Sequence, residues 1–80
     1  MYILSQNGTV LLKGDRVTSF EIEKRTGEAV WMINAYTPQD KVHLGEFKNR
    51  PLADEVLDTL AMALTGTNCR VLQIPADKEK

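Results

Sequence analysis

One apolar stripe at helical spacing constrains this chain more than any other feature of its sequence. The stripe recurs at every fourth position, at Leu52, Val56, Leu60 and Leu64. Residues four apart lie on the same side of an α-helix, so the stripe predicts one amphipathic helix with one buried face. Asn49 is suited to cap its first turn, and Gly66 is suited to end its last turn. We therefore predict a single helix over residues 50–65.

The remaining apolar runs have the features of β-strands. Asn7-Gly8 favours the tight turn of a hairpin, and an apolar run flanks it on each side. Phe20 and Ile22 alternate with polar residues, as in a strand with one buried face. Pro38 breaks a later run, because proline cannot donate to a strand ladder. The predicted strands cover residues 2–6, 9–13, 16–24, 30–37 and 41–47, and a short C-terminal strand over 70–74 is left open.

These elements predict one α+β domain, an antiparallel meander of four to five strands with the helix packed on one face. A chain of 80 residues has room for one core, which we expect within residues 1–75, followed by a polar tail over 76–80. Cys69 is the only cysteine and His43 the only histidine, so neither an internal disulfide nor a Cys/His zinc site can form. We expect no cofactor and no metal, and we expect a partner chain to stabilise so small a core.

The strand pair over residues 30–47 is apolar on both of its predicted faces. With a loop at residues 38–40, the predicted cross-strand pairs are Trp31 with Phe47, Ile33 with Gly45, and Ala35 with His43. Trp31, Ile33 and Phe47 then share one face, while Met32 and Leu44 share the other. One helix covers only one face, so the other must close into a barrel, meet a second copy or bind a partner protein. These five apolar residues form the candidate interface, and a homodimer is the predicted assembly.

The charge of the chain argues against several classes of partner. Ten lysines and arginines stand against eleven acidic residues, and the formal net charge is −1. This balance gives no electrostatic footprint for nucleic acid or anionic lipid. No apolar run approaches the roughly 20 residues that a membrane helix needs, and the first residues lack the pattern of a signal peptide. Together with the lone cysteine, these features predict a cytoplasmic protein with no membrane partner.

Basic residues near the junction between the last long strand and the helix keep a nucleic-acid role open as an alternative. The candidate contacts are Lys41, Lys48 and Arg50, near aromatic residues suited to stacking on single-stranded bases. The negative net charge and the absence of the basic and aromatic consensus of RNA-binding sheets argue against this role.

A catalytic role would depend on His43, because histidine is the side chain that ordinarily titrates near neutral pH. Ser5, Ser19 and Asp40 are conceivable partners for it, but no spacing selects them. Cys69 follows the predicted helix rather than preceding it, so no helix N-terminus activates its thiol. No phosphate-binding glycine loop is present. We predict no catalytic residue, no metal ligand and no enzymatic activity.

Two stretches carry a resemblance to a known group of proteins. One is the opening run 1–6 before the Asn-Gly turn, and the other is Leu44-Gly45-Glu46-Phe47-Lys48 leading into Ala53, Val56 and Leu57, with Ile33-Asn34-Ala35 on the middle strand. This layout resembles small uncharacterised proteins of Gram-positive bacteria and their phages, whose pattern is LG-x-[YF]-x-x-x-x-x-A-x-x-[VL]-L. Asn49-Arg50-Pro51 departs from the Thr-Glu-Glu-like helix start of that group. The layout is also similar to half of a pleckstrin-homology-like barrel, a fold that serves interaction modules.

The resemblance implies no established activity, so no catalytic residue is carried over from it. The leading prediction is a non-enzymatic protein-interaction or accessory module, related to phages or mobile elements. One alternative is a nucleic-acid-associated regulator that uses Lys41, Lys48 and Arg50. The other alternative is a small enzyme that acts through His43.

Overall fold

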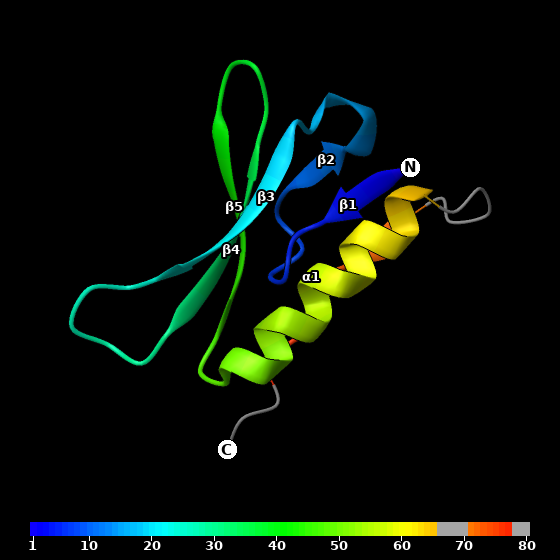
Figure 1. Ribbon diagram of the computed structural model, residues 1–80. Coiled ribbons are helices and arrows are strands. Elements are labelled where there is room, and N and C mark those ends of the chain that lie inside the picture. Colours follow the sequence, from blue (N-terminus) through cyan, green and yellow to red (C-terminus); the bar gives the residue numbers. More distant parts are fainter. Residues whose placement is uncertain (66–70, 78–80) are drawn as a thin grey trace.

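The computed structural model describes residues 1–65 and 71–77, which form two three-stranded sheets and one helix (Figure 1). The first sheet has the order β2-β1-β6, with β1 at Tyr2–Leu4, β2 at Leu11–Lys13 and β6 at Val71–Gln73. The second sheet has the order β3-β4-β5, with β3 at Ser19–Lys24, β4 at Trp31–Tyr36 and β5 at Lys41–Phe47. The helix α1 spans Arg50–Thr65. A short 3₁₀ turn, η1 at Gly14–Arg16, joins β2 to β3.

The predicted α+β class and the single helix are confirmed, but the single meander is wrong. The strands β3, β4 and β5 do form an antiparallel meander. The strands β1 and β2 leave it, because η1 turns the chain between β2 and β3. The C-terminal strand that the sequence left open is present as β6, and it pairs in parallel with β1. The predicted helix-ending Gly66 and the lone Cys69 lie outside the described residues, as does the end of the predicted tail.

The helix α1 closes the core by packing its apolar stripe against the second sheet. Val56 and Leu60 of the stripe are buried, together with Ala53 beside them on α1. The other buried apolar side chains come from both sheets and the residue after β6: Ile3, Ile33, Ala35, Leu44, Phe47 and Ile74. Asn49 caps the helix as predicted, because its side-chain oxygen accepts from the Leu52 amide at 3.2 Å. No helix in the described part of the chain is long and apolar enough to cross a membrane.

A β-bulge at Leu44 changes which side chains of β5 face the core. Pairs near the end of β5, such as Ile33 with Gly45, follow the predicted register. The register then shifts, so that Asn34 rather than Ala35 lies opposite His43. Leu44 is the extra residue, and its side chain is buried in the core. A one-residue slip reverses every side chain beyond it, so His43 points away from the helix.

The bulge corrects the prediction that strands 30–47 are apolar on both faces. On the core face, the cross-strand rows are Lys24–Trp31–Phe47, Ile22–Ile33–Gly45 and Phe20–Ala35–Val42. On the outer face, the rows are Glu23–Met32–Glu46, Glu21–Asn34–His43 and Ser19–Tyr36–Lys41. The outer face is therefore polar except for Met32, and we call it the polar face. The helix covers the apolar face, so strands 30–47 have no second apolar face that another copy would have to cover.

The two sheets meet at Gly45 and Gln6. The side chain of Gln6 pairs with the backbone of Glu46 through two hydrogen bonds, of 3.0 and 3.1 Å. Its amide nitrogen also donates to the carbonyl of Pro75 at 3.1 Å. A Cβ atom on Gly45 would lie 3.1 Å from both Gln6 and Ile74. The absence of a side chain at Gly45 thus allows the two sheets to approach each other closely.

Candidate functional site

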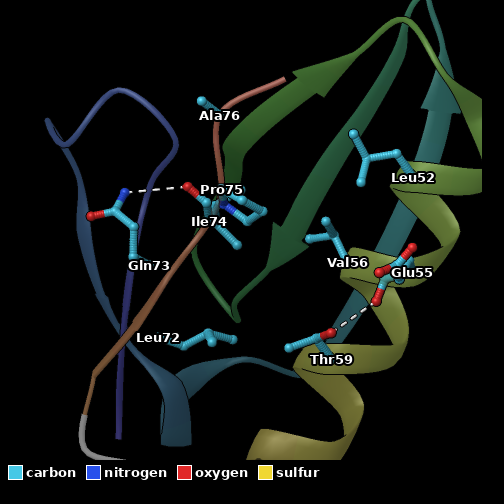
Figure 2. A pocket seen from close by; sticks show the side chains of 9 residues that line it. All are labelled: Leu52, Glu55, Val56, Thr59, Leu72, Gln73, Ile74, Pro75 and Ala76. Atoms are coloured by element: carbon cyan, nitrogen blue, oxygen red, sulfur yellow. Dashed lines mark hydrogen bonds between the residues drawn. The ribbon is translucent and has the colours of Figure 1, made fainter. Parts of the chain in front are cut away.

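A groove of about 230 Å³ separates α1 from the chain segment over residues 72–76 (Figure 2). The helix lines it with Leu52, Glu55, Val56 and Thr59. These residues follow the i, i+3, i+4, i+7 spacing of a single helix face. Leu72 and Ile74 line the opposite wall with apolar side chains, and Pro75 lies beside them. We call this cavity the α1–β6 groove.

The strand wall of the α1–β6 groove is an edge of the first sheet. Five consecutive residues, 72–76, line the groove, so backbone as well as side chains borders it. In the part of the chain that the structure describes, β6 has β1 as its only strand neighbour. The Ile74 amide donates to the Leu4 carbonyl at 2.9 Å, so it points toward β1. Backbone groups alternate along a strand, which directs the N–H and C=O of Gln73 to the opposite edge.

The side chain of Gln73 holds this edge in place. Its amide nitrogen donates to the Ser5 carbonyl at 2.8 Å, across the pairing of β6 with β1. The same nitrogen lies 3.3 Å from the Ile74 carbonyl, the contact drawn in Figure 2. On the facing wall, the Thr59 hydroxyl donates to the Glu55 carbonyl at 2.9 Å. The polar groups of Gln73 and Thr59 are thus engaged within the chain, and neither of them spans the groove.

The polar face carries a hydrogen-bond network centred on Asn34, whose exposed fraction is only 2%. The Asn34 amide nitrogen lies 3.0 Å from a Glu23 oxygen and 3.4 Å from a Glu21 oxygen. Its carbonyl oxygen lies 3.2 Å from Nδ1 of His43. Buried polar side-chain atoms in the described residues all have partners. The network therefore satisfies Asn34 internally, as burial of an amide requires.

Charges on the polar face are held by their neighbours. The Tyr36 hydroxyl donates to Glu21 at 2.5 Å, which lowers the pKa of Glu21 and raises the pKa of Tyr36. The ammonium of Lys41 lies 2.8 Å from Glu23, and this contact raises the pKa of Lys41. Hydrogen bonds to a charged form stabilise that form, which explains the directions for Glu21 and Lys41. Tyr36 shifts upward because its neutral hydroxyl is the donor.

His43 belongs to this network rather than to a catalytic arrangement with the partners considered from sequence. Its Nε2 lies 3.3 Å from Glu46, whose carboxylate also lies 2.5 Å from Arg25. Among the described residues, its side-chain contacts are thus with Asn34 and Glu46, not with Ser5, Ser19 or Asp40. No cluster of three side chains in the described ranges is arranged to hold a metal ion.

The five candidate interface residues are not brought together on one surface. Ile33, Leu44 and Phe47 are buried in the core beneath α1. Trp31 is half-buried at the edge of the core, with the Lys24 ammonium 5.9 Å from its ring. Met32 is half-buried on the polar face, where its sulfur lies 3.8 Å from Arg25. Three of the five therefore have almost no exposed surface to offer a partner.

The three candidate nucleic-acid contacts are separated as well. Lys41 begins β5 and Lys48 directly follows its last residue, so the two lie about 20 Å apart at the usual rise of a strand. Lys41 is held by Glu23, and the guanidinium of Arg50 lies 3.0 Å from Asp54. These residues do not form one continuous basic surface.

Searches of family models, of curated proteins and of solved structures find no match to this chain. The resemblance to small proteins of Gram-positive bacteria and their phages therefore remains a prediction.

The α1–β6 groove was missed from the sequence, although part of its signal is present there. Leu72 and Ile74 alternate with polar residues, and Leu52 and Val56 belong to the helix stripe. Both patterns predict burial, and both sets of residues do reach the core. The parallel pairing of β6 with β1 places one edge of β6 opposite α1, and no local pattern specifies that pairing.

Proposed function

We propose that this chain is a non-enzymatic protein-interaction module that binds an extended segment of a partner in the α1–β6 groove. One observation carries the proposal: the edge of β6 and an apolar cavity lie side by side. An extended segment can add to a sheet edge through its backbone while alternate side chains enter pockets. The Gln73 backbone provides the edge, and Leu52, Val56 and Leu72 provide the pocket.

The size of the groove supports a side chain as its occupant. Its volume of about 230 Å³ lies below the roughly 300–1,000 Å³ of pockets that enclose small molecules. A leucine side chain with its adjacent backbone fits this space better than a cofactor does.

The groove chemistry supports binding over catalysis. Glu55 is the only titratable side chain among the nine residues that line the groove. The Thr59 hydroxyl is engaged with a carbonyl of its own helix. Catalysis by a side chain needs a nucleophile or base with a group that orients it, and these two residues do not supply that pair.

The test is a titration of the full ¹⁵N-labelled chain, followed by NMR, with the peptide acetyl-Thr-Ser-Thr-Leu-Thr-Ser-Thr-amide. We expect saturable shifts of the Gln73 and Ala76 amides at millimolar peptide. A second peptide, with the leucine replaced by glycine, should shift them much less. Shifts that stay absent from residues 72–76, or that map only to β3, would contradict the proposal.

Two substitutions on α1 provide a matched pair for this titration. Thr59→Trp places a large side chain at the exposed mouth of the groove and should abolish the shifts at Gln73. Asp58→Trp adds the same bulk at an exposed position that does not line the groove and should preserve them. Equal effects of the two tryptophans would argue against binding in the groove.

A further inference from the structure

We infer that the α1–β6 groove selects a segment in which a basic residue lies two positions from its apolar anchor. The inference rests on the proposed function and specifies the chemistry of the partner. It depends on the charge of the helix wall and on the spacing of side chains along a strand.

Glu55 supplies the charge. It is the charged residue among those that line the groove, and its side chain is exposed. Among the described residues its carboxylate has no ion-pair partner, whereas nearby Asp54 is paired with Arg50 at 3.0 Å. Asp58, one turn further along α1, is exposed as well and adds negative potential beside the rim. A cationic side chain in the groove would therefore meet an unpaired carboxylate.

Strand geometry supplies the spacing. The helix wall runs from Leu52 to Thr59, about 10 Å at 1.5 Å per residue. Side chains on the same face of an added strand recur every second residue, about 6.6 Å apart. A leucine that enters the apolar floor thus places the residues two positions away on the same side, facing the helix rim. Adjacent residues point away from the groove.

This arrangement distinguishes the groove from the edge of the second sheet at β3. The edge of β3 has charged residues along it, including Glu21, Glu23 and Lys24, and such residues discourage strand addition. The α1–β6 groove borders β6 rather than β3. A segment added at β6 can pair with the strand backbone and insert its apolar side chain into the α1–β6 groove.

The experiment compares three capped heptapeptides on the full chain, by NMR titration at low salt. The first is Thr-Lys-Thr-Leu-Thr-Lys-Thr, and the second replaces both lysines by glutamate. The third, Thr-Thr-Lys-Leu-Lys-Thr-Thr, has the composition of the first with its lysines moved next to the anchor. We expect the first to bind about twofold to fivefold more tightly than the other two, the upper part of the range for an exposed ion pair. The difference in affinity should shrink at about 0.5 M salt, because salt screens the attraction between exposed charges.

A matched pair of variants tests the role of Glu55. Glu55→Gln should reduce the preference for the first peptide over the second to less than about twofold. Asp58→Asn removes a neighbouring acid that does not line the groove and should leave most of that preference intact. An unchanged preference in Glu55→Gln would overturn the inference.

The outcomes separate this inference from the proposed function. If all three peptides shift the Gln73 amide with equal affinity, the charge selection is wrong and the interaction module stands. If none of them shifts residues 72–76 at millimolar concentration, both are wrong.

Discussion

Asn34 shows how a single buried amide organises an exposed sheet face. Its amide nitrogen donates to Glu21 and Glu23 of β3, and its carbonyl oxygen contacts Nδ1 of His43 on β5. The bulge at Leu44 is what brings His43 opposite this residue. Without that extra residue, Val42 and His43 would exchange faces, and an imidazole would point into the apolar core.

The contact between Tyr36 and Glu21 leads to a pH-dependent prediction. The lowered pKa of Glu21 means that its contribution to stability is complete above the ordinary carboxyl range, about pH 4.3, and is lost as the pH falls through the lowered value. The raised pKa of Tyr36 means that its contribution is complete below about pH 10 and is lost as the pH rises further. In Tyr36→Phe, we expect the pKa of Glu21 to rise toward its ordinary value, measured by ¹³C carboxyl NMR.

Tyr2→Phe is the control for this titration, because Tyr2 lies on the other sheet and does not contact Glu21. It should leave the Glu21 midpoint unchanged. A Glu21 midpoint that is the same in Tyr36→Phe and in the parent chain would show that the hydroxyl does not hold the carboxylate.

Much of the residue-level structure could be predicted from the spacing of apolar residues and from the residues at turns. The bulge in β5 could not be predicted in this way. The pairs of Trp31 with Phe47 and Ile33 with Gly45 agree with the predicted register, because the bulge at Leu44 offsets a loop that is one residue shorter than predicted. The sequence around the extra residue of β5 does not reveal it, because Val42, His43 and Leu44 are compatible with a strand in either register. The bulged register buries Leu44 under the helix, and this contact depends on tertiary packing rather than on the local sequence.

Among the helices and strands, α1 connects the most parts of the fold. It packs on all three strands of the second sheet, and one of its faces also forms a wall of the α1–β6 groove. Its bounds, Arg50–Thr65, agree with the predicted helix because cap, period and composition all favour the same segment.

Truncation of the stripe should test how much the fold depends on this helix. Leu60 is fully buried, so Leu60→Ala is expected to lower the free energy of unfolding by about 2–5 kcal/mol. Met62→Ala, at a residue that is 72% exposed, should change it by no more than about 0.5 kcal/mol. Urea unfolding followed by circular dichroism measures both. Similar losses for the two variants would mean that the apolar stripe does not form the helix contact.

The sheet elements were less predictable than the helix. The Asn-Gly turn and the alternation of β3 gave correct strands, but β1, β2 and β6 have only three residues each. Strands this short carry too few side chains to specify a partner, so their pairing depends on the rest of the fold. The α1–β6 groove could not be predicted for the same reason, because β6 forms one of its walls.

Over the molecule as described, three of the five large apolar side chains that are exposed lie on the first sheet, and the other two lie on α1. Tyr2 lies opposite Val71, and Leu4 lies opposite Leu11, all on one face of the β2-β1-β6 sheet. Leu11 is 58% exposed and Val71 is 56% exposed. Exposed apolar patches on a sheet favour association.

We therefore expect any self-association to use this face rather than strands 30–47. Sedimentation velocity at high micromolar concentration should detect a dimer, and Leu11→Glu should shift it toward monomer because the charge would be buried in the contact. Met32→Glu, on the polar face, is the control and should leave the dimer unchanged. If Met32→Glu dissociates the dimer and Leu11→Glu does not, the dimer interface lies on the second sheet.

The parallel pairing of β6 with β1 also has a kinetic consequence. Gln73 binds the carbonyl of Ser5, 68 positions away, so this contact closes a loop of most of the chain. Closing so long a loop is entropically costly and slow, and each of the two paired strands is only three residues long. The first sheet should thus be completed late in folding and open early in native-state hydrogen exchange. A segment bound beside β6 would bind only the closed form, so its binding free energy would add to the stability of the entire fold.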